Sequence, residues 1–302
     1  MSPRINPPKS HFTKGGLRGI WTYRGFSLET LRNKLTNLIP TNNIHKANAV
    51  RETMKNISVE IAPRTFEQFE KDISAIKKAY PDINFLNIPD LLDFEIRSWE
   101  AAKIGVKYFT NVVPHLRAID FNLREPFKLI PYLKQHNINS VLIVTGDKPQ
   151  GMTRIVYRNS CLELIRIFKK EAPDIKIYAG LDQYRSSFRH ELDYIEDKKI
   201  AGADGFFTQP FFDIRLLEIY LDLLKGYEVF WGISPVLKEA TRNYWESKNN
   251  SFFPSDFQPT IEWNADFARR AIESISACNS SVYLMPININ TINYLNQVFK
   301  SR

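Results

Sequence analysis

The sequence is poor in cysteine and has no long apolar run. Two cysteines, Cys161 and Cys278, occur among 302 residues. They are too few for a disulfide framework, so a reducing, cytoplasmic compartment is expected. No stretch of about 18 consecutive apolar residues is present, which predicts a chain without a membrane-spanning helix or a membrane partner. The first residues also lack the apolar segment of a secretory signal peptide.

Several catalytic signatures are absent as well. The sequence contains neither a G-x-S-x-G turn nor a Walker A motif, so nothing supports an α/β-hydrolase or a P-loop enzyme. The five histidines form no H-x-H or H-E-x-x-H pair. A histidine-rich zinc centre is therefore not expected.

Basic residues are concentrated at the N-terminus. Residues 1–50 contain eight lysines and arginines and one acid, Glu29, so the rest of the chain holds 33 of the 41 basic and 32 of the 33 acidic residues. A nucleic-acid surface would be spread over a folded face. We therefore expect no nucleic-acid partner, but a basic N-terminal extension that is solvated or contacts another subunit of a homo-oligomer. A transit peptide is the alternative, opposed by Pro3, Pro7 and Pro8.

From about residue 56 onward, short apolar runs alternate with amphipathic segments. The eight candidate strands are 56–62, 84–89, 108–115, 140–147, 176–182, 205–212, 228–236 and 281–287. The candidate helices between them are 66–79, 93–104, 125–135, 157–170, 188–201, 214–225, 238–248, 264–277 and 290–300. This alternation predicts an α/β fold, a (β/α)₈ TIM barrel over residues 51–302. A doubly wound sheet is the alternative, but no glycine-rich turn follows the first strand.

Polar residues gather where the candidate strands end, which is where TIM barrels place their chemistry. Glu60 lies within the apolar sequence VEIA. Burial there would raise the pKa of its carboxyl group and suit a general acid; a structural ion pair with Arg64 or another basic group is the alternative. No lysine lies inside a strand, which disfavours a Schiff-base aldolase. A carboxylate-bound Mg²⁺ remains possible, with the ligands drawn from Glu60, Asp90, Asp147 and Asp182.

Five segments in order resemble motifs of the 5,10-methylenetetrahydrofolate reductase family. They are SVEIAPRT (58–65), VVPHLRAID (112–120), VTGDKP (144–149), KKIAGADGFFTQPFFD (198–213) and GISPV (232–236). They are similar to the family's S-x-E-x-x-P-R-T, P-H-L-x-x-x-D, R-G-D-P-P, K-x-x-A-G-A-x-x-x-x-T-Q-x-F-F-D and G-I-x-P-V. Residues 1–50 have no counterpart in this resemblance.

The resemblance implies a flavoprotein with FAD at the strand ends. NADH or NADPH would supply electrons for reduction of a folate, 5,10-methylenetetrahydrofolate, in a ping-pong reaction. Glu60 would be the acid and Asp147 would adjust the flavin and place the substrate. The implied substrate-binding residues are Gln209, Phe211 and Trp245. The implied cofactor-binding residues are His115, Thr145, Asp147, Tyr157, Glu191 and Lys198, and no metal is implied.

Some positions depart from the family pattern. Thr145 stands where the family has the arginine of R-G-D, which removes a flavin contact. The ends of strands two, five and eight read NIPDLLD, GLDQYR and LMPIN instead of the family's sequences. Two other functions therefore stay open. One is a flavin-free folate- or pterin-binding barrel that acts as a methyl-transfer partner or regulator, and the other is a carboxylate-metal lyase.

Overall fold

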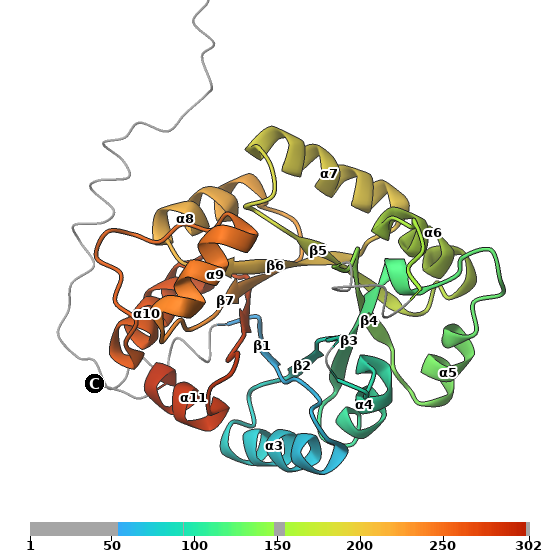
Figure 1. The fold of residues 1–302 in the computed structure, drawn as a ribbon, viewed down its shortest axis with the longest axis horizontal. Helices are drawn as coiled ribbons and strands as arrows, with labels where there is room; N and C mark the ends of the chain where they lie inside the picture. The colour runs from blue at the N-terminus through green and yellow to red at the C-terminus, as the bar shows by residue number, and fades with distance from the viewer. Residues whose placement is uncertain (1–53, 93, 148–154, 300–302) are drawn as a thin grey trace, which may run out of the picture. The chain divides into compact units, whose positions relative to one another are not determined.

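The computed structural model describes residues 54–92, 94–147 and 155–299. Eight strands pair in parallel in sequence order, and β1 also pairs with β8, which closes the barrel (Figure 1). They are β1 (Asn56–Glu60), β2 (Phe85–Ile88), β3 (Asn111–Arg117), β4 (Ser140–Val144), β5 (Lys176–Leu181), β6 (Gly205–Phe211), β7 (Val229–Ile233) and β8 (Ser281–Leu284). The predicted (β/α)₈ barrel is confirmed. The predicted N-terminal extension lies outside the described residues.

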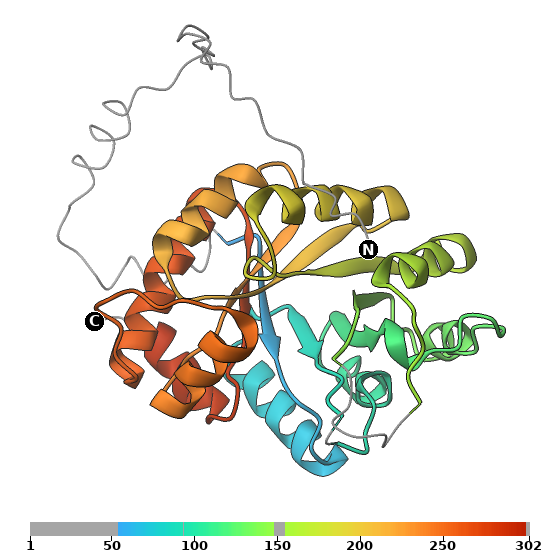
Figure 2. The ribbon, with the colours of Figure 1, turned by 45° about the horizontal axis from the view of Figure 1, so that its top comes forward.

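Helices follow the strands and surround the barrel (Figures 1 and 2). They are α3 (Phe66–Ala79), α4 (Ser98–Gly105), α5 (Leu129–Gln135), α6 (Cys161–Glu171), α7 (Phe188–Ala201), α8 (Ile214–Leu223), α9 (Glu239–Asn249), α10 (Ile261–Ala277) and α11 (Thr291–Phe299), with the 3₁₀ turn η1 (Ala118–Asp120). No helix in this described part is long and apolar enough to cross a membrane.

Two helices have the predicted bounds because side chains cap their first turns. The Thr65 hydroxyl accepts a hydrogen bond from the Gln68 N–H at the start of α3. The Ser187 hydroxyl accepts one from the His190 N–H at the start of α7. The predicted helix 157–170 begins later, at Cys161, because Ser160 and Glu163 form a capping box. Strand β3 starts and ends later than predicted, so Arg117 belongs to the strand.

The barrel interior is filled mainly by aromatic side chains. The buried cluster consists of Phe85, Val113, Leu142, Tyr178, Phe207, Phe230, Tyr283 and Met285. Phe207 and Phe230 stack with ring centroids 4.3 Å apart, and each buried aromatic ring contributes about 1.5–3 kcal/mol by leaving water. The interior is therefore packed, and the space for a ligand lies above it, at the carboxyl ends of the strands.

Candidate functional site

A central cavity of about 600 Å³ lies at the carboxyl ends of the strands. This volume is within the usual range for cofactor and substrate sites. The cavity is bordered by six of the predicted site residues, namely Glu60, His115, Thr145, Asp147, Lys198 and Gln209. The strand ends therefore bring together residues that are up to 149 positions apart in the sequence, from Glu60 to Gln209.

Glu60 ends β1, and its side chain is only 11% exposed. The Tyr283 hydroxyl donates a hydrogen bond to Glu60 Oε2. Burial raises the pKa of Glu60 from 4.5 to about 7, although the hydrogen bond from Tyr283 lowers it. Arg64 does not pair with Glu60, because its guanidinium donates to Asn288 Oδ1 over 2.8 Å. The carboxyl group is thus poised to exchange a proton near neutral pH.

His115 is a neutral partner of this carboxyl group. Its Nε2 lies 3.9 Å from Glu60 Oε2 and 2.9 Å from Asn87 Oδ1. Burial lowers the pKa of the imidazole to about 3, so the contact with Glu60 is not an ion pair at neutral pH. Asn87 in turn donates from Nδ2 to Ser58 Oγ, which leaves its Oδ1 as the acceptor and assigns the proton of His115 to Nε2.

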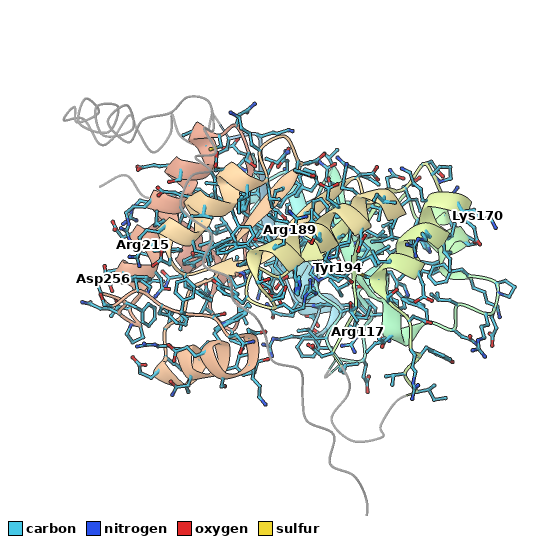
Figure 3. All side chains as sticks on the ribbon, turned by 90° about the horizontal axis from the view of Figure 1, so that it is seen from above. Arg117, Lys170, Arg189, Tyr194, Arg215 and Asp256 are labelled. Carbon is cyan, nitrogen blue, oxygen red and sulfur yellow. The ribbon has the colours of Figure 1, made fainter. Side chains whose placement is uncertain are left out.

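The segment after β4 carries two predicted residues at the cavity edge. Thr145 and Asp147 both border the cavity with exposed side chains. The Thr145 hydroxyl forms a hydrogen bond with the hydroxyl of Tyr194 on α7, and the Cys161 thiol lies 2.9 Å from the same Tyr194 oxygen. Asp147 is not the N-cap of α6, since that position belongs to Ser160. Figure 3 labels Tyr194.

Lys198 and Glu191 form a buried ion pair on α7. Both side chains are 1% exposed, with Nζ 3.9 Å from Glu191 Oε1. Lys198 donates to the Gly180 carbonyl, and burial lowers its pKa to about 8. Glu191 also accepts from Arg185, which borders the cavity. Lys198 therefore faces the cavity, whereas Glu191 lies behind it and holds Arg185.

Gln209 is placed by an irregularity in β6. The pairing of β6 with β7 shifts register between Phe207 and Pro210, as at a β-bulge. A Cβ atom on Gly232 would lie 2.8 Å from the Thr208 carbonyl oxygen, so this close approach requires glycine. Phe207 fills the barrel and Gln209 borders the cavity, and the bulge changes the side on which the following residues lie.

Four predicted residues do not border the cavity in the described part of the chain. Glu191 is the first. Phe211 is fully buried between β6 and the helices, beside Trp231 and Tyr220. Trp245 packs on Phe212, and Tyr157 donates its main-chain N–H to the Ile119 carbonyl. The strand after the bulge turns Phe211 toward the helix layer, and Trp245 is 8% exposed.

Several residues that border the cavity were not predicted as site residues, among them Arg185, Tyr283 and Arg117. Arg117 lies two positions after His115 on β3, so the alternation of a strand could have found it. A second cavity of about 660 Å³, formed by the segments after β1, β2 and β8, also borders Glu60.

The carboxylates proposed as Mg²⁺ ligands are not gathered at one point. Asp90 is bound by Arg97, and Glu60 by Tyr283. Within residues 54–92, 94–147 and 155–299, no group of three or more acidic, histidine or cysteine side chains is arranged to hold a metal ion.

Comparisons with known proteins identify the fold and the family. A search of curated proteins gives no match. Among solved structures, 2,3-dimethylmalate lyase, a member of the PEP mutase/isocitrate lyase superfamily, has a TM-score of 0.51 at 10% identity, over 85% of this chain and 84% of that chain. Oxaloacetate acetylhydrolase in complex with oxalate has a TM-score of 0.52 at 10% identity, with the same coverage. These likenesses show the barrel fold alone.

The sequence pattern of one enzyme family covers most of the barrel. The pattern described as methylenetetrahydrofolate reductase matches residues 45–240. That range includes Glu60, His115, Asp147, Lys198 and Gln209, and it is well over half of the 302 residues. The chain belongs to the methylenetetrahydrofolate reductase family.

Proposed function

We propose that this chain is a flavin-dependent reductase of one-carbon folate metabolism. In this proposal it reduces 5,10-methylenetetrahydrofolate to 5-methyltetrahydrofolate with NADH or NADPH through bound FAD. The observation that carries the proposal is the buried Glu60 carboxyl group, with a pKa of about 7, at the edge of a 600 Å³ cavity. The family to which the chain belongs supports the same reaction.

The residues around the cavity fit a flavin. Leu142, Phe207 and Met285 offer apolar surface to a planar ring system, while Gln209 and His115 offer hydrogen-bonding groups beside it. Lys198 and Arg185 also border the cavity and provide positive charge for an anionic group. Bound FAD would supply the transfer of two electrons between NAD(P)H and the folate.

The protein's own part in the reaction is proton transfer and placement. Neutral Glu60 would donate its proton to a nitrogen of the imidazolidine ring while a C–N bond of that ring breaks, which leaves an iminium carbon as the hydride acceptor. Tyr283 holds the carboxyl group in place and stabilises the carboxylate that remains. His115 stays neutral, so it adds no positive charge that would lower the pKa of Glu60.

The second cavity supports a folate as substrate. Glu60, Pro89 and Leu91 border both cavities, so a ligand in the second cavity reaches the acid. This second cavity is also lined by Arg64 and Phe94, with the guanidinium carbon 5.3 Å from the ring centroid. An aromatic ring and a cation suit the aminobenzoyl and glutamate parts of a folate.

The test separates the two half-reactions. The purified protein should be yellow, oxidise NAD(P)H and reduce 5,10-methylenetetrahydrofolate. Glu60→Gln should keep its flavin and its oxidation of NAD(P)H by an artificial acceptor, but lose at least about 10²-fold in the folate half-reaction. Equal losses in both half-reactions would assign Glu60 a structural role.

The flavin-free pterin-binding barrel is the second candidate. The observation that favours it is Thr145, which replaces the arginine of the family pattern and is hydrogen-bonded to Tyr194 instead. A colourless protein that binds folate but takes up no FAD would support this candidate and contradict the reductase.

A further inference from the structure

Arg117 is a buried cation that the family motifs do not assign to the site. It ends β3, where it lies in register with Val144 of β4. Its side chain is 8% exposed and borders the central cavity. Burial of an arginine is costly unless its guanidinium is paired and hydrogen-bonded, because its charge leaves water. Figure 3 labels Arg117 below the helix that carries Tyr194.

The guanidinium of Arg117 is not fully hydrogen-bonded in the described structure. Its Nε lies 3.3 Å from Asp120 Oδ2, but this buried nitrogen makes no hydrogen bond. Asp120 instead accepts a hydrogen bond of 2.7 Å from Arg97, which is also bound to Asp90. Asp120 is therefore shared by two arginines, and the Arg117 guanidinium keeps an unfilled hydrogen-bond donor.

The segment after β4 is built on top of Arg117. Nη2 donates a hydrogen bond to the main-chain carbonyl of Asp147. Gly146 has a φ of +90°, and a Cβ atom there would lie 2.9 Å from the Arg117 Cβ and 3.1 Å from its Nε. Glycine at 146 thus lets the chain lie directly against the arginine, which fixes the guanidinium beside the cavity edge where Thr145 and Asp147 lie.

We propose that Arg117 binds a phosphate of the flavin cofactor and provides, from β3, the cation that is missing at position 145. This inference rests on the proposed function. Arginine suits the task because its planar guanidinium can offer two parallel N–H donors to a phosphate. Thr145, just after β4, and Arg117, at the end of β3, border the same cavity, and Gly146 next to Thr145 lies against Arg117.

The experiment measures flavin affinity rather than turnover. The apo-protein is titrated with FAD and, separately, with riboflavin, which has the same ring system without phosphate, and binding is followed by flavin fluorescence. Arg117→Met should weaken FAD by roughly 10- to 100-fold, the loss of one charge-assisted hydrogen bond, and leave riboflavin unchanged. Arg117→Lys should keep part of the FAD affinity, because it keeps the charge.

An exchange variant covers the case in which Arg117→Met does not fold. Arg117→Thr with Thr145→Arg moves the cation to β4, where position 145 is exposed and has room for a longer side chain. This pair should bind FAD at least about tenfold more tightly than Arg117→Thr alone. Folding of each variant is checked by circular dichroism.

The outcomes separate the two proposals. If the unaltered protein takes up no FAD, the reductase proposal fails and this inference fails with it. If the unaltered protein binds FAD, but Arg117→Met binds it equally well, only the inference about Arg117 is overturned. Equal losses for FAD and riboflavin would also overturn it, since they would show that Arg117 merely supports the Asp147 segment.

Discussion

The Glu60 carboxyl group should give the folded barrel a pH dependence that one substitution removes. Its pKa rises from 4.5 to about 7 on folding because of burial. Between these values the folded chain holds a proton that the unfolded chain has lost, so Glu60 makes the protein less stable as pH rises through this window. At 1.36 kcal/mol for each pH unit, the full effect is about 3 kcal/mol above pH 7.

The comparison with Glu60→Gln isolates this contribution. His115 acts in the opposite direction, because its pKa is lowered to about 3, and its contribution to stability is lost as pH falls below 6.5. Both proteins contain His115, so it cancels in their difference. Gln keeps an oxygen that can accept from Tyr283 but carries no charge. Between pH 5 and pH 8.5, the free energy of unfolding of Glu60→Gln should rise by about 2–3 kcal/mol relative to that of the unaltered protein.

Urea unfolding at a series of pH values measures this difference. Both proteins must show the same m-value, which is the slope of the free energy of unfolding against urea concentration. Glu218→Gln on α8 is the control, since its side chain is exposed and such changes stay within about 0.5 kcal/mol. A difference between Glu60→Gln and the unaltered protein that does not change with pH would refute the reasoning. It would mean that the folded protein holds Glu60 as an ordinary carboxylate, which is unsuited to donate a proton at neutral pH.

Three further changes test the remaining assignments. Phe211→Ala should cost about 3–5 kcal/mol of stability, because it empties a fully buried site, and should leave the folate affinity measured by titration unchanged. Gln209→Ala should weaken folate binding and leave the stability nearly unchanged. Deletion of residues 1–45 should leave the barrel folded, since β1 begins at Asn56, and should weaken a homo-oligomer in light scattering if the basic residues join subunits; high salt should mimic the deletion, and an unfolded product would contradict the prediction.

The barrel could be predicted from the sequence because its signals are local. Apolar strands alternate with amphipathic helices, and caps such as Thr65 and Ser187 mark where helices start. Glu60 could be predicted for the same reason, because a carboxylate within an apolar run is buried whichever strand lies beside it. Burial is the largest cause of its raised pKa. These features depend on neighbours along the chain.

The side chains that a motif places on one strand are less predictable when the strand is irregular. Phe211 and Gln209 belong to one motif, and regular alternation would put both on the same face of β6. The register shift between Phe207 and Pro210 breaks that alternation, so Gln209 borders the cavity and Phe211 packs against Trp231. The bulge depends on contact with Gly232 of β7, which the sequence of β6 does not contain.

Contacts between strands bear on the altered β4 motif, because the neighbouring strand β3 also carries an arginine at this edge. Along the chain, Thr145 stands where the family motif has an arginine. Around the ring of strands, an arginine is still present at the same edge of the cavity, since Arg117 of β3 donates to the carbonyl of Asp147 and lies against Gly146. The charge of the cavity depends on which cations reach it, and not on the strand that carries them. A missing motif residue in a barrel therefore argues against a cofactor only after both neighbouring strands have been searched for a side chain that takes its place.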